Sequence, residues 1–173
     1  MTSNSGGGGG PLVVDFQAFR GARNEFILKE LAAIDVRTGR YDLVLFAPPY
    51  EKTQLHPKQI KTNDWLEKHY HRIQWNAGNI PYKDMVCIIA RICSTSTVIY
   101  VKGLEKANFL RQYYHHGEVI DLNDIKAPLI PKSFIPSVKC PVPHQSDTTL
   151  QCALRKSLFY RSWLTLENKK KIS

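Results

Sequence analysis

The chain has 173 residues, 43% of them hydrophobic and 23% charged, which is typical of a globular protein with a core of its own. It has no apolar run of membrane-spanning length and no signal-peptide core, so we expect an intracellular protein, cytoplasmic or nuclear, whose four cysteines are reduced or metal-bound. The net charge of +9 favours a polyanionic partner such as nucleic acid.

The N-terminal part predicts three antiparallel strands. Residues 1–10 are rich in glycine and predict a flexible leader, with order beginning at Pro11. Apolar runs over residues 12–19, 26–36 and 41–47 predict the strands, and the short glycine-containing connections between them favour hairpins.

The second half of the chain predicts helices that alternate with strands. Asn63 and Asp64 are expected to cap a helix through Tyr70, and Pro81 is expected to begin another. The remaining elements are expected as a strand at 97–101, a helix at 106–113, a strand at 118–122 and a helix at 150–164. Since alternation implies parallel strands joined by crossover helices, we predict an α/β domain over residues 11–166, with a mixed five-stranded sheet flanked by helices, and a basic tail at 167–173.

This order of elements is that of the ribonuclease-H-like fold, and several phrases of the sequence resemble its proofreading-exonuclease branch. Asp15 keeps the first acidic position of that branch, but Gln17 replaces a glutamate. Lys106 stands at the position of a second aspartate, and Gln151 and Lys156 stand at those of a histidine and an aspartate. Because carboxylates hold the two magnesium ions in such enzymes, the resemblance implies that two-metal catalysis has been lost.

The same segments resemble the Maelstrom domain of germline small-RNA (piRNA) silencing, a diverged branch of the fold with a Glu-Cys-His-Cys zinc site. The phrase KELAAI around Glu30 is similar to the family's glutamate phrase, and Cys140, His144 and Cys152-Ala-Leu are similar to its second phrase, with one additional residue before the histidine. The resemblance covers most of residues 12–166 and implies a structural Zn²⁺ held by these four residues. The high-mobility-group box of full Maelstrom proteins is missing, so we expect a stand-alone relative, such as one derived from a mobile element.

The ligand types also suit zinc on chemical grounds. Two thiolates, an imidazole and a carboxylate can close a tetrahedral site, and the ion would fix the long proline-rich segment 127–144. A carboxylate inside the apolar run around Glu30 is costly to bury unless it is paired or metal-bound. Alternation, however, groups Glu30 with Leu28 and Ala32 and leaves an outward orientation open. The sequence is also compatible with a buried Cys152 without metal, with a surface His144, and with a fourth ligand from the His115–His116 pair.

Three functions are compatible with these features. The first is a noncatalytic module that binds nucleic acid, expected to be single-stranded RNA, with Lys102, Lys106 and Lys156 on the phosphates and aromatic side chains on the bases. The second is a divergent ribonuclease that works without the usual carboxylates, with His71 or His144 as general base. The third is a scaffold that binds proteins through its loops. Lys106 and Lys156 could equally be ordinary solvent-facing helix residues.

Overall fold

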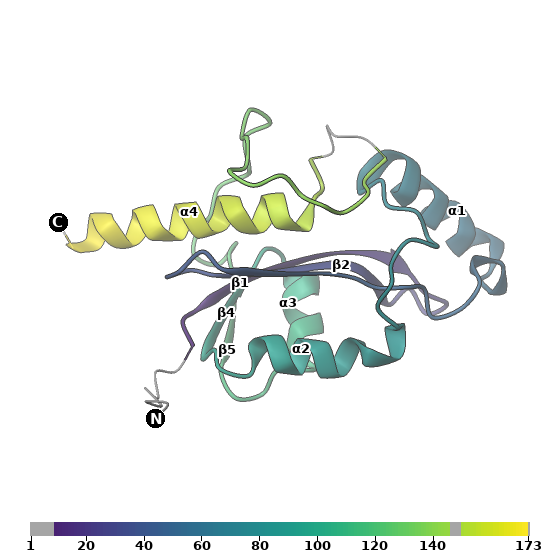
Figure 1. Cartoon of the computed structure of the whole chain (residues 1–173), viewed down its shortest axis with the longest axis horizontal. Coiled ribbons are helices and arrows are strands. Elements are labelled where there is room, and N and C mark those ends of the chain that lie inside the picture. Colours follow the sequence, from purple (N-terminus) through teal and green to yellow (C-terminus); the bar gives the residue numbers. More distant parts are fainter. Residues whose placement is uncertain (1–8, 146–149, 173) are drawn as a thin grey trace, which may run out of the picture.

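A five-stranded sheet forms the centre of the computed structural model, which describes residues 9–145 and 150–172 (Figure 1). The strands are β1 (Leu12–Arg20), β2 (Phe26–Asp35), β3 (Tyr41–Leu45), β4 (Val98–Val101) and β5 (Glu118–Asp121). Their order across the sheet is β3-β2-β1-β4-β5. The first three strands pair antiparallel, whereas β1, β4 and β5 pair parallel. The α/β class and the mixed five-stranded sheet are therefore confirmed.

Helices cover both faces of this sheet (Figure 1). On one face, α2 (Met85–Cys93) and α3 (Leu104–Arg111) pack over the first core cluster, which includes Phe16 and Leu31. On the other face, α4 (Ala153–Ile172) packs over the second cluster, which includes Ile34 and Leu154. The remaining helical elements are η1 (Lys52–Gln54), α1 (Pro57–Trp65), the π-helical turn η2 (Leu66–Tyr70) and η3 (Tyr82–Asp84).

The helix predicted from an Asn63–Asp64 cap begins earlier, at Pro57 in α1. His56 is its N-cap, and its side chain accepts a hydrogen bond from the Lys58 N–H. Proline suits the first helical position because its missing N–H would have no intrahelical partner. Asn63 is instead fully buried inside the helix, where its amide accepts from the Arg20 N–H and donates to the Arg20 carbonyl. The residue expected as a cap thus fastens α1 to the end of β1.

Both ends of the predicted domain also differ in the structure. Helix α4 runs to Ile172, so it continues past the predicted end at 164 and through most of the expected basic tail. Lysines in its last turn suit the negative end of the helix dipole. At the other terminus, Gly9 bridges to Ser96 and Gly10 accepts a hydrogen bond from the Ser96 hydroxyl, so order begins before Pro11. The rest of the expected leader, residues 1–8, lies outside the described residues.

A register shift in the β1–β2 pair breaks the alternation of β2. Gln17 pairs with Glu30, but Ala18 pairs with Leu28, so Lys29 is an extra residue in β2. Leu28 and Leu31 consequently belong to the same core cluster although they are three residues apart. Ala32 belongs to the other cluster, so the predicted grouping of Leu28 with Ala32 is wrong.

Lys29, the extra residue, is itself buried. Only 1% of it is exposed, and its ammonium donates to three backbone carbonyls, those of Phe46, Trp75 and Ala77. Burial lowers the pKa of Lys29 to about 8, with the charge of Glu67 acting in the opposite direction. These bonds hold the segment that follows η2 against the sheet, on the same stretch of β2 that carries Glu30.

Candidate metal centre and the adjoining pocket

The four predicted zinc ligands meet at one point between β2 and the start of α4. One ligand atom from each of Glu30, Cys140, His144 and Cys152 lies within 4.8 Å of the other three. Glu30 and Cys152 are buried, and the other two are partly buried. The donor set is therefore the one expected from the sequence, brought together from a strand, a loop and a helix start.

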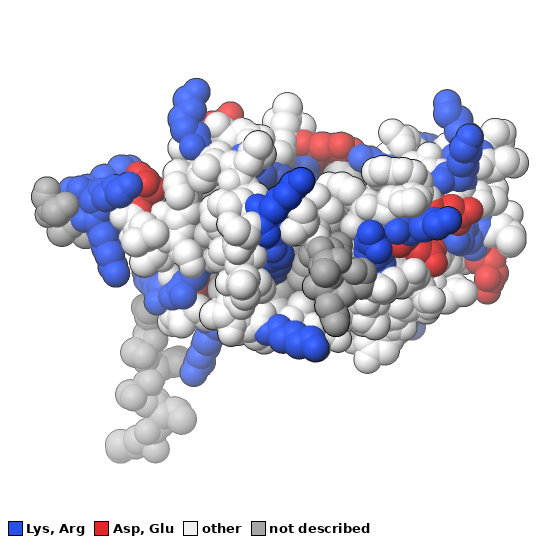
Figure 2. Space-filling model, turned by 90° about the horizontal axis from the view of Figure 1, so that it is seen from above, with Lys and Arg blue, Asp and Glu red and all other residues white. Residues whose placement is uncertain are grey.

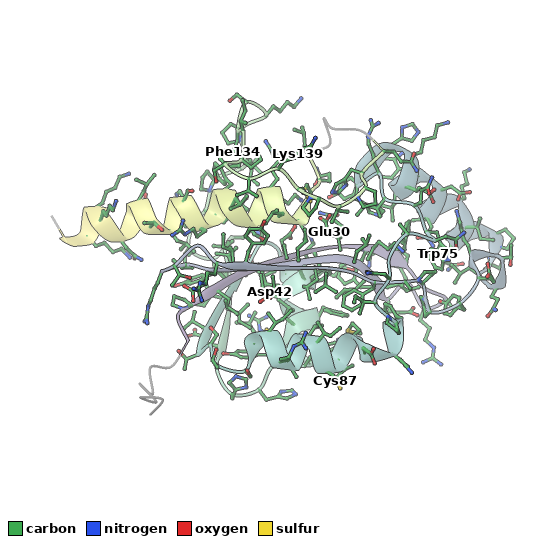
Figure 3. The ribbon with its side chains drawn as sticks, in the orientation of Figure 1. Glu30, Asp42, Trp75, Cys87, Phe134 and Lys139 are labelled. Carbon is green, nitrogen blue, oxygen red and sulfur yellow. The ribbon has the colours of Figure 1, made fainter. Side chains whose placement is uncertain are left out.

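Glu30 is oriented by two contacts. Its Oε1 accepts a hydrogen bond from the backbone N–H of Ala153, the first residue of α4, and its Oε2 lies 2.8 Å from the Nε2 atom of His144. Figure 3 shows Glu30 between the sheet and α4. Since none of its surface is exposed, the outward orientation that the sequence left open is wrong.

His144 is held so that one particular nitrogen faces the other ligands. Its Nδ1 lies 2.6 Å from the carbonyl oxygen of His71, which can only accept, so Nδ1 carries a proton. Nε2 then points at Glu30 and lies 4.0 Å from Sγ of Cys140. A ring fixed by a hydrogen bond from its second nitrogen is the usual arrangement of histidine ligands to metals.

The surroundings of these groups attract positive charge. Burial lowers the pKa of His144, but the side chains of Cys152 and Glu30 outweigh it and raise the pKa to about 10. A hydrogen bond with Cys152 lowers the pKa of the Cys140 thiol, whereas the pKa of Cys152 is raised by the same hydrogen bond and by burial. The donor atoms thus favour a cation at their centre, and their chemistry fits Zn²⁺ in a closed four-coordinate site.

The other histidines take no part in this cluster. His116 contacts the Cys93 carbonyl through Nε2, and His115 is exposed, so this pair does not supply a fourth ligand. His71 is fully buried against the ring of Phe19. Burial and the charge of His144 lower its pKa to about 3. A residue without exposed surface cannot contact a substrate, so the structure gives no support to His71 as a general base.

The exonuclease-like positions lie on β1, on α3 and at the beginning of α4, next to the metal centre. The ammonium of Lys106 lies 2.8 Å from Oδ1 of Asp15 and 2.6 Å from the Phe16 carbonyl oxygen. Asp15 is 3% exposed, so this ion pair is largely shielded from water. A lysine therefore supplies the positive charge at the carboxylate that, in the exonuclease pattern, would face a metal ion.

The other expected phosphate-binding lysines have different environments. Lys102 donates to the carbonyl of Ala127, and burial lowers its pKa. Lys156 is half-buried on α4, where burial lowers its pKa while the charge of Asp15 raises it. Gln151 is half-buried just before the cluster residue Cys152. Lys106 and Lys156, which the sequence also allowed as ordinary solvent-facing helix residues, are therefore both partly buried.

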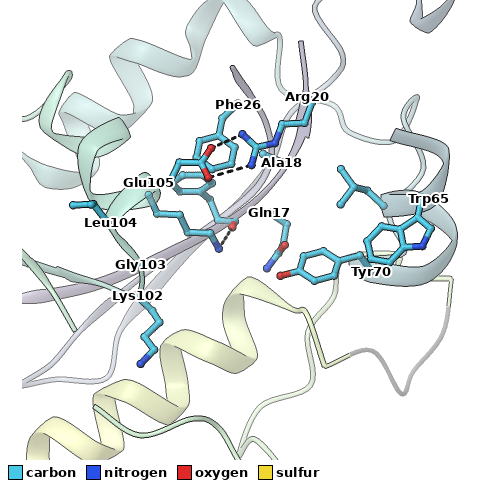
Figure 4. A pocket seen from close by; sticks show the side chains of 13 residues that line it. Gln17, Ala18, Arg20, Phe26, Trp65, Tyr70, Lys102, Gly103, Leu104 and Glu105 are labelled. Carbon is cyan, nitrogen blue, oxygen red and sulfur yellow. Dashed lines mark hydrogen bonds and ion pairs between the residues drawn. The ribbon is translucent and has the colours of Figure 1, made fainter. Parts of the chain in front are cut away.

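A pocket of about 430 Å³ opens beside the Asp15–Lys106 pair (Figure 4). Its walls come from β1, η2 and α3. Ring stacking joins Trp65 and Tyr70, whose centroids are 6.0 Å apart with 26° between the planes. Across the pocket, Arg20 and Glu105 form an ion pair. The lining residues are Phe16, Gln17, Ala18, Arg20, Phe26, Trp65, Leu66, Tyr70, Lys102, Gly103, Leu104, Glu105 and Lys106.

Sequence reasoning located the lysines and Gln17 but did not identify which aromatic residues lie near them. Trp65 and Tyr70 were expected only as members of the helix that Asn63 and Asp64 would cap, and Trp65 is 54% exposed. The only available signal was the density of aromatic residues after Asn63, because the π-helical turn that orients them is not visible in a single sequence.

Comparison with protein-family models, with curated proteins and with solved structures found no match for this chain. In the described ranges 9–145 and 150–172, no helix combines the length and apolarity needed to cross a membrane.

Proposed function

We propose that this chain is a noncatalytic nucleic-acid-binding protein whose ligand is single-stranded RNA. The observation that carries the proposal is the ion pair between Asp15 and Lys106 beside an open aromatic pocket. An ammonium on the carboxylate disfavours a divalent metal ion there, while lysines and an exposed aromatic ring are the groups that bind phosphates and unpaired bases.

We propose further that the domain has the ribonuclease-H-like fold in its Maelstrom-like form. The strand order β3-β2-β1-β4-β5, with three antiparallel strands followed by two parallel ones, is the order that this resemblance implies. The loss of acidic residues at Gln17, Lys106 and Lys156 agrees with the noncatalytic branch. A role in small-RNA or transposon silencing, with the protein partners that this requires, is what the resemblance implies for the biological setting.

In this proposal Zn²⁺ has a structural role. Four protein donors leave no open position for water or substrate, which is the arrangement of structural rather than catalytic zinc. The ion would join β2 to the proline-rich loop and to α4 through Glu30, Cys140 and Cys152. Because His144 would be a ligand, it would not be available for proton transfer, which argues against a ribonuclease that uses it as general base.

The charge distribution supports a polyanionic ligand. Lys and Arg side chains are spread over the face of the molecule that bears α4 and its neighbouring loops, and acidic side chains are fewer there (Figure 2). Each phosphate contact releases condensed counterions, so binding through such a face weakens as salt rises. A protein-binding scaffold would not require this dependence.

Filter binding of a labelled single-stranded oligoribonucleotide at increasing salt tests the proposal. Replacing Lys102 and Lys156 together by glutamine is expected to weaken binding about tenfold or more, and to reduce the slope of log affinity against log salt by about one for each lysine. The matched control replaces the exposed Lys83 and Arg91, near or on α2, by glutamine and should leave affinity within about twofold.

The same samples report on catalysis. RNA incubated with the protein in Mg²⁺, Mn²⁺ or EDTA is expected to stay intact. Salt-independent binding would overturn the nucleic-acid proposal, and equal losses in the two double variants would overturn the assignment of Lys102 and Lys156 as phosphate contacts. Metal-dependent cleavage would instead establish a divergent ribonuclease.

A further inference from the structure

We propose that the pocket between β1, η2 and α3 binds one unpaired base, stacked on the aromatic pair Trp65–Tyr70 and hydrogen-bonded by the amide of Gln17. This inference rests on the proposed function, because it assumes that a single strand reaches this surface. It extends the proposed function by naming the part of the RNA strand that the protein recognises and the residues that recognise it.

The first argument comes from the aromatic wall. Trp65 ends α1 and is 54% exposed, although tryptophan is among the side chains that gain most from burial. Its ring stacks on Tyr70, which Figure 4 shows between Trp65 and Gln17, and both rings line the pocket, so the two together form an aromatic wall of which the tryptophan part is largely exposed. A base is flat, aromatic and able to cover such a ring, and stacking of this kind does not depend on which base is present.

The second argument comes from a buried amide. Gln17 is 3% exposed and lines the pocket, but its Nε2 has no hydrogen-bond partner among residues 9–145 and 150–172. A buried donor without a partner destabilises the fold, since the bond to water that it gives up is not replaced. Every base presents ring-nitrogen or carbonyl acceptors on its edge, so a base that stacks on the Trp65–Tyr70 pair could accept from this donor.

The third argument comes from the charges around the pocket. Arg20 and Glu105 neutralise each other at one wall and Lys106 is paired with Asp15, while Lys102 lines another wall and brings positive charge to it. An RNA strand would therefore place its phosphates at the lysine side of the pocket and its base at the aromatic side. The volume of about 430 Å³ suits one nucleotide and is too small for a base pair with its backbone.

The test compares an oligoadenylate with an abasic oligoribonucleotide of the same length, followed by tryptophan fluorescence and by filter binding. Trp163 is replaced by phenylalanine, so that Trp65 and the buried Trp75 are the remaining fluorophores. Oligoadenylate is expected to quench the signal and the abasic strand is not. Trp65→Leu should weaken oligoadenylate binding by about fivefold to a hundredfold and abasic binding by less than about twofold. Tyr41→Leu, at an exposed aromatic residue outside the pocket, is the control.

Gln17→Leu gives a readout that a structural role would not produce. Because the leucine removes an unsatisfied buried donor, the melting temperature is expected to stay equal or to rise, while oligoadenylate binding weakens at least about fivefold. Equal affinity for the two strands, with no effect of Trp65→Leu or Gln17→Leu, would overturn the base pocket and leave the nucleic-acid function standing. Failure of both strands to bind would overturn both.

Discussion

Nε2 of His144 lies 2.8 Å from Oε2 of Glu30, and the other oxygen of that carboxylate accepts a hydrogen bond from the first residue of α4. Strand β2 is thereby connected through one side chain to a loop and to a helix. The thiols of Cys140 and Cys152 lie close enough to share one ion with these two groups. A single cation at this point would therefore join three separate parts of the chain.

Zinc should bind in a one-to-one ratio, and a chelator should lower the melting temperature by at least about 10 °C, because metal binding here is coupled to packing of the loop and α4. Glu30→Gln keeps an oxygen for the Ala153 N–H but removes the negative charge, so zinc affinity should fall at least about tenfold. Cys87→Ser, at an exposed cysteine outside the cluster, should bind zinc normally. Protein free of zinc whose melting is unchanged by chelator would contradict the site.

Lys29→Met should reduce the free energy of unfolding by about 2–4 kcal/mol, because three backbone carbonyls lose their shared donor in a buried place. Lys83→Met, at an exposed position, should change it by less than about 0.5 kcal/mol. Chemical denaturation of both variants measures the difference. Equal stabilities would mean that water replaces the ammonium without cost.

Alanine substitutions at two glycines should distinguish the cost of backbone strain from the cost of steric overlap. Both have positive φ, 109° at Gly78 and 106° at Gly103. A Cβ at Gly103 would meet nothing within 4 Å, whereas at Gly78 it would overlap the backbone of Phe46 and Ala47. Gly103→Ala is therefore expected to cost about 1–2 kcal/mol and Gly78→Ala at least about 2 kcal/mol more. Thermal denaturation that ranked them equally would place the cost in strain alone.

Acid should destabilise the fold through His71. Its pKa is about 3 in the folded protein, below the usual 6.5 of the unfolded chain, so only the unfolded state takes up this proton between those values. Stability should then fall with decreasing pH, by up to about 1.4 kcal/mol per unit below pH 6.5. His71→Asn keeps an acceptor for the Ile73 N–H but does not titrate, so its curve should be flatter. Both proteins are measured with chelator, which removes the separate effect of zinc release, and parallel curves would assign the acid loss to other groups.

Much of the sheet follows from local patterns in the sequence. The apolar runs of β1, β2 and β3 are separated by short connections, and the later alternation of helices and strands requires parallel pairing. The four metal ligands could not all be predicted from local patterns. Cys140, His144 and Cys152 are close in sequence, whereas Glu30 is far away. Only the family resemblance joined Glu30 to them, and the structure brings the four together.

The features that the sequence did not predict have one physical cause in common. In each of them, the conformation of a residue depends on a partner that is distant in sequence. Asn63 resembles a cap, but its amide is satisfied by the backbone of Arg20. No prediction was made for Lys29, whose charge is met by carbonyls of residues 46, 75 and 77. The extra residue in β2 arises from its pairing with β1, so the period of β2 by itself could not reveal it.

The hydrogen bond from the Ala153 N–H to Glu30 caps the N-terminus of α4 with a side chain of β2, which is far away in sequence. A ligand that fixes this carboxylate must, by thermodynamic linkage, also favour the closed state of the first helical turn, and opening of that turn must weaken the ligand's hold. Hydrogen exchange of the amide protons of residues 153–156 with solvent should therefore slow as the free zinc concentration rises. The stability of the beginning of α4 would then report the zinc concentration around the protein.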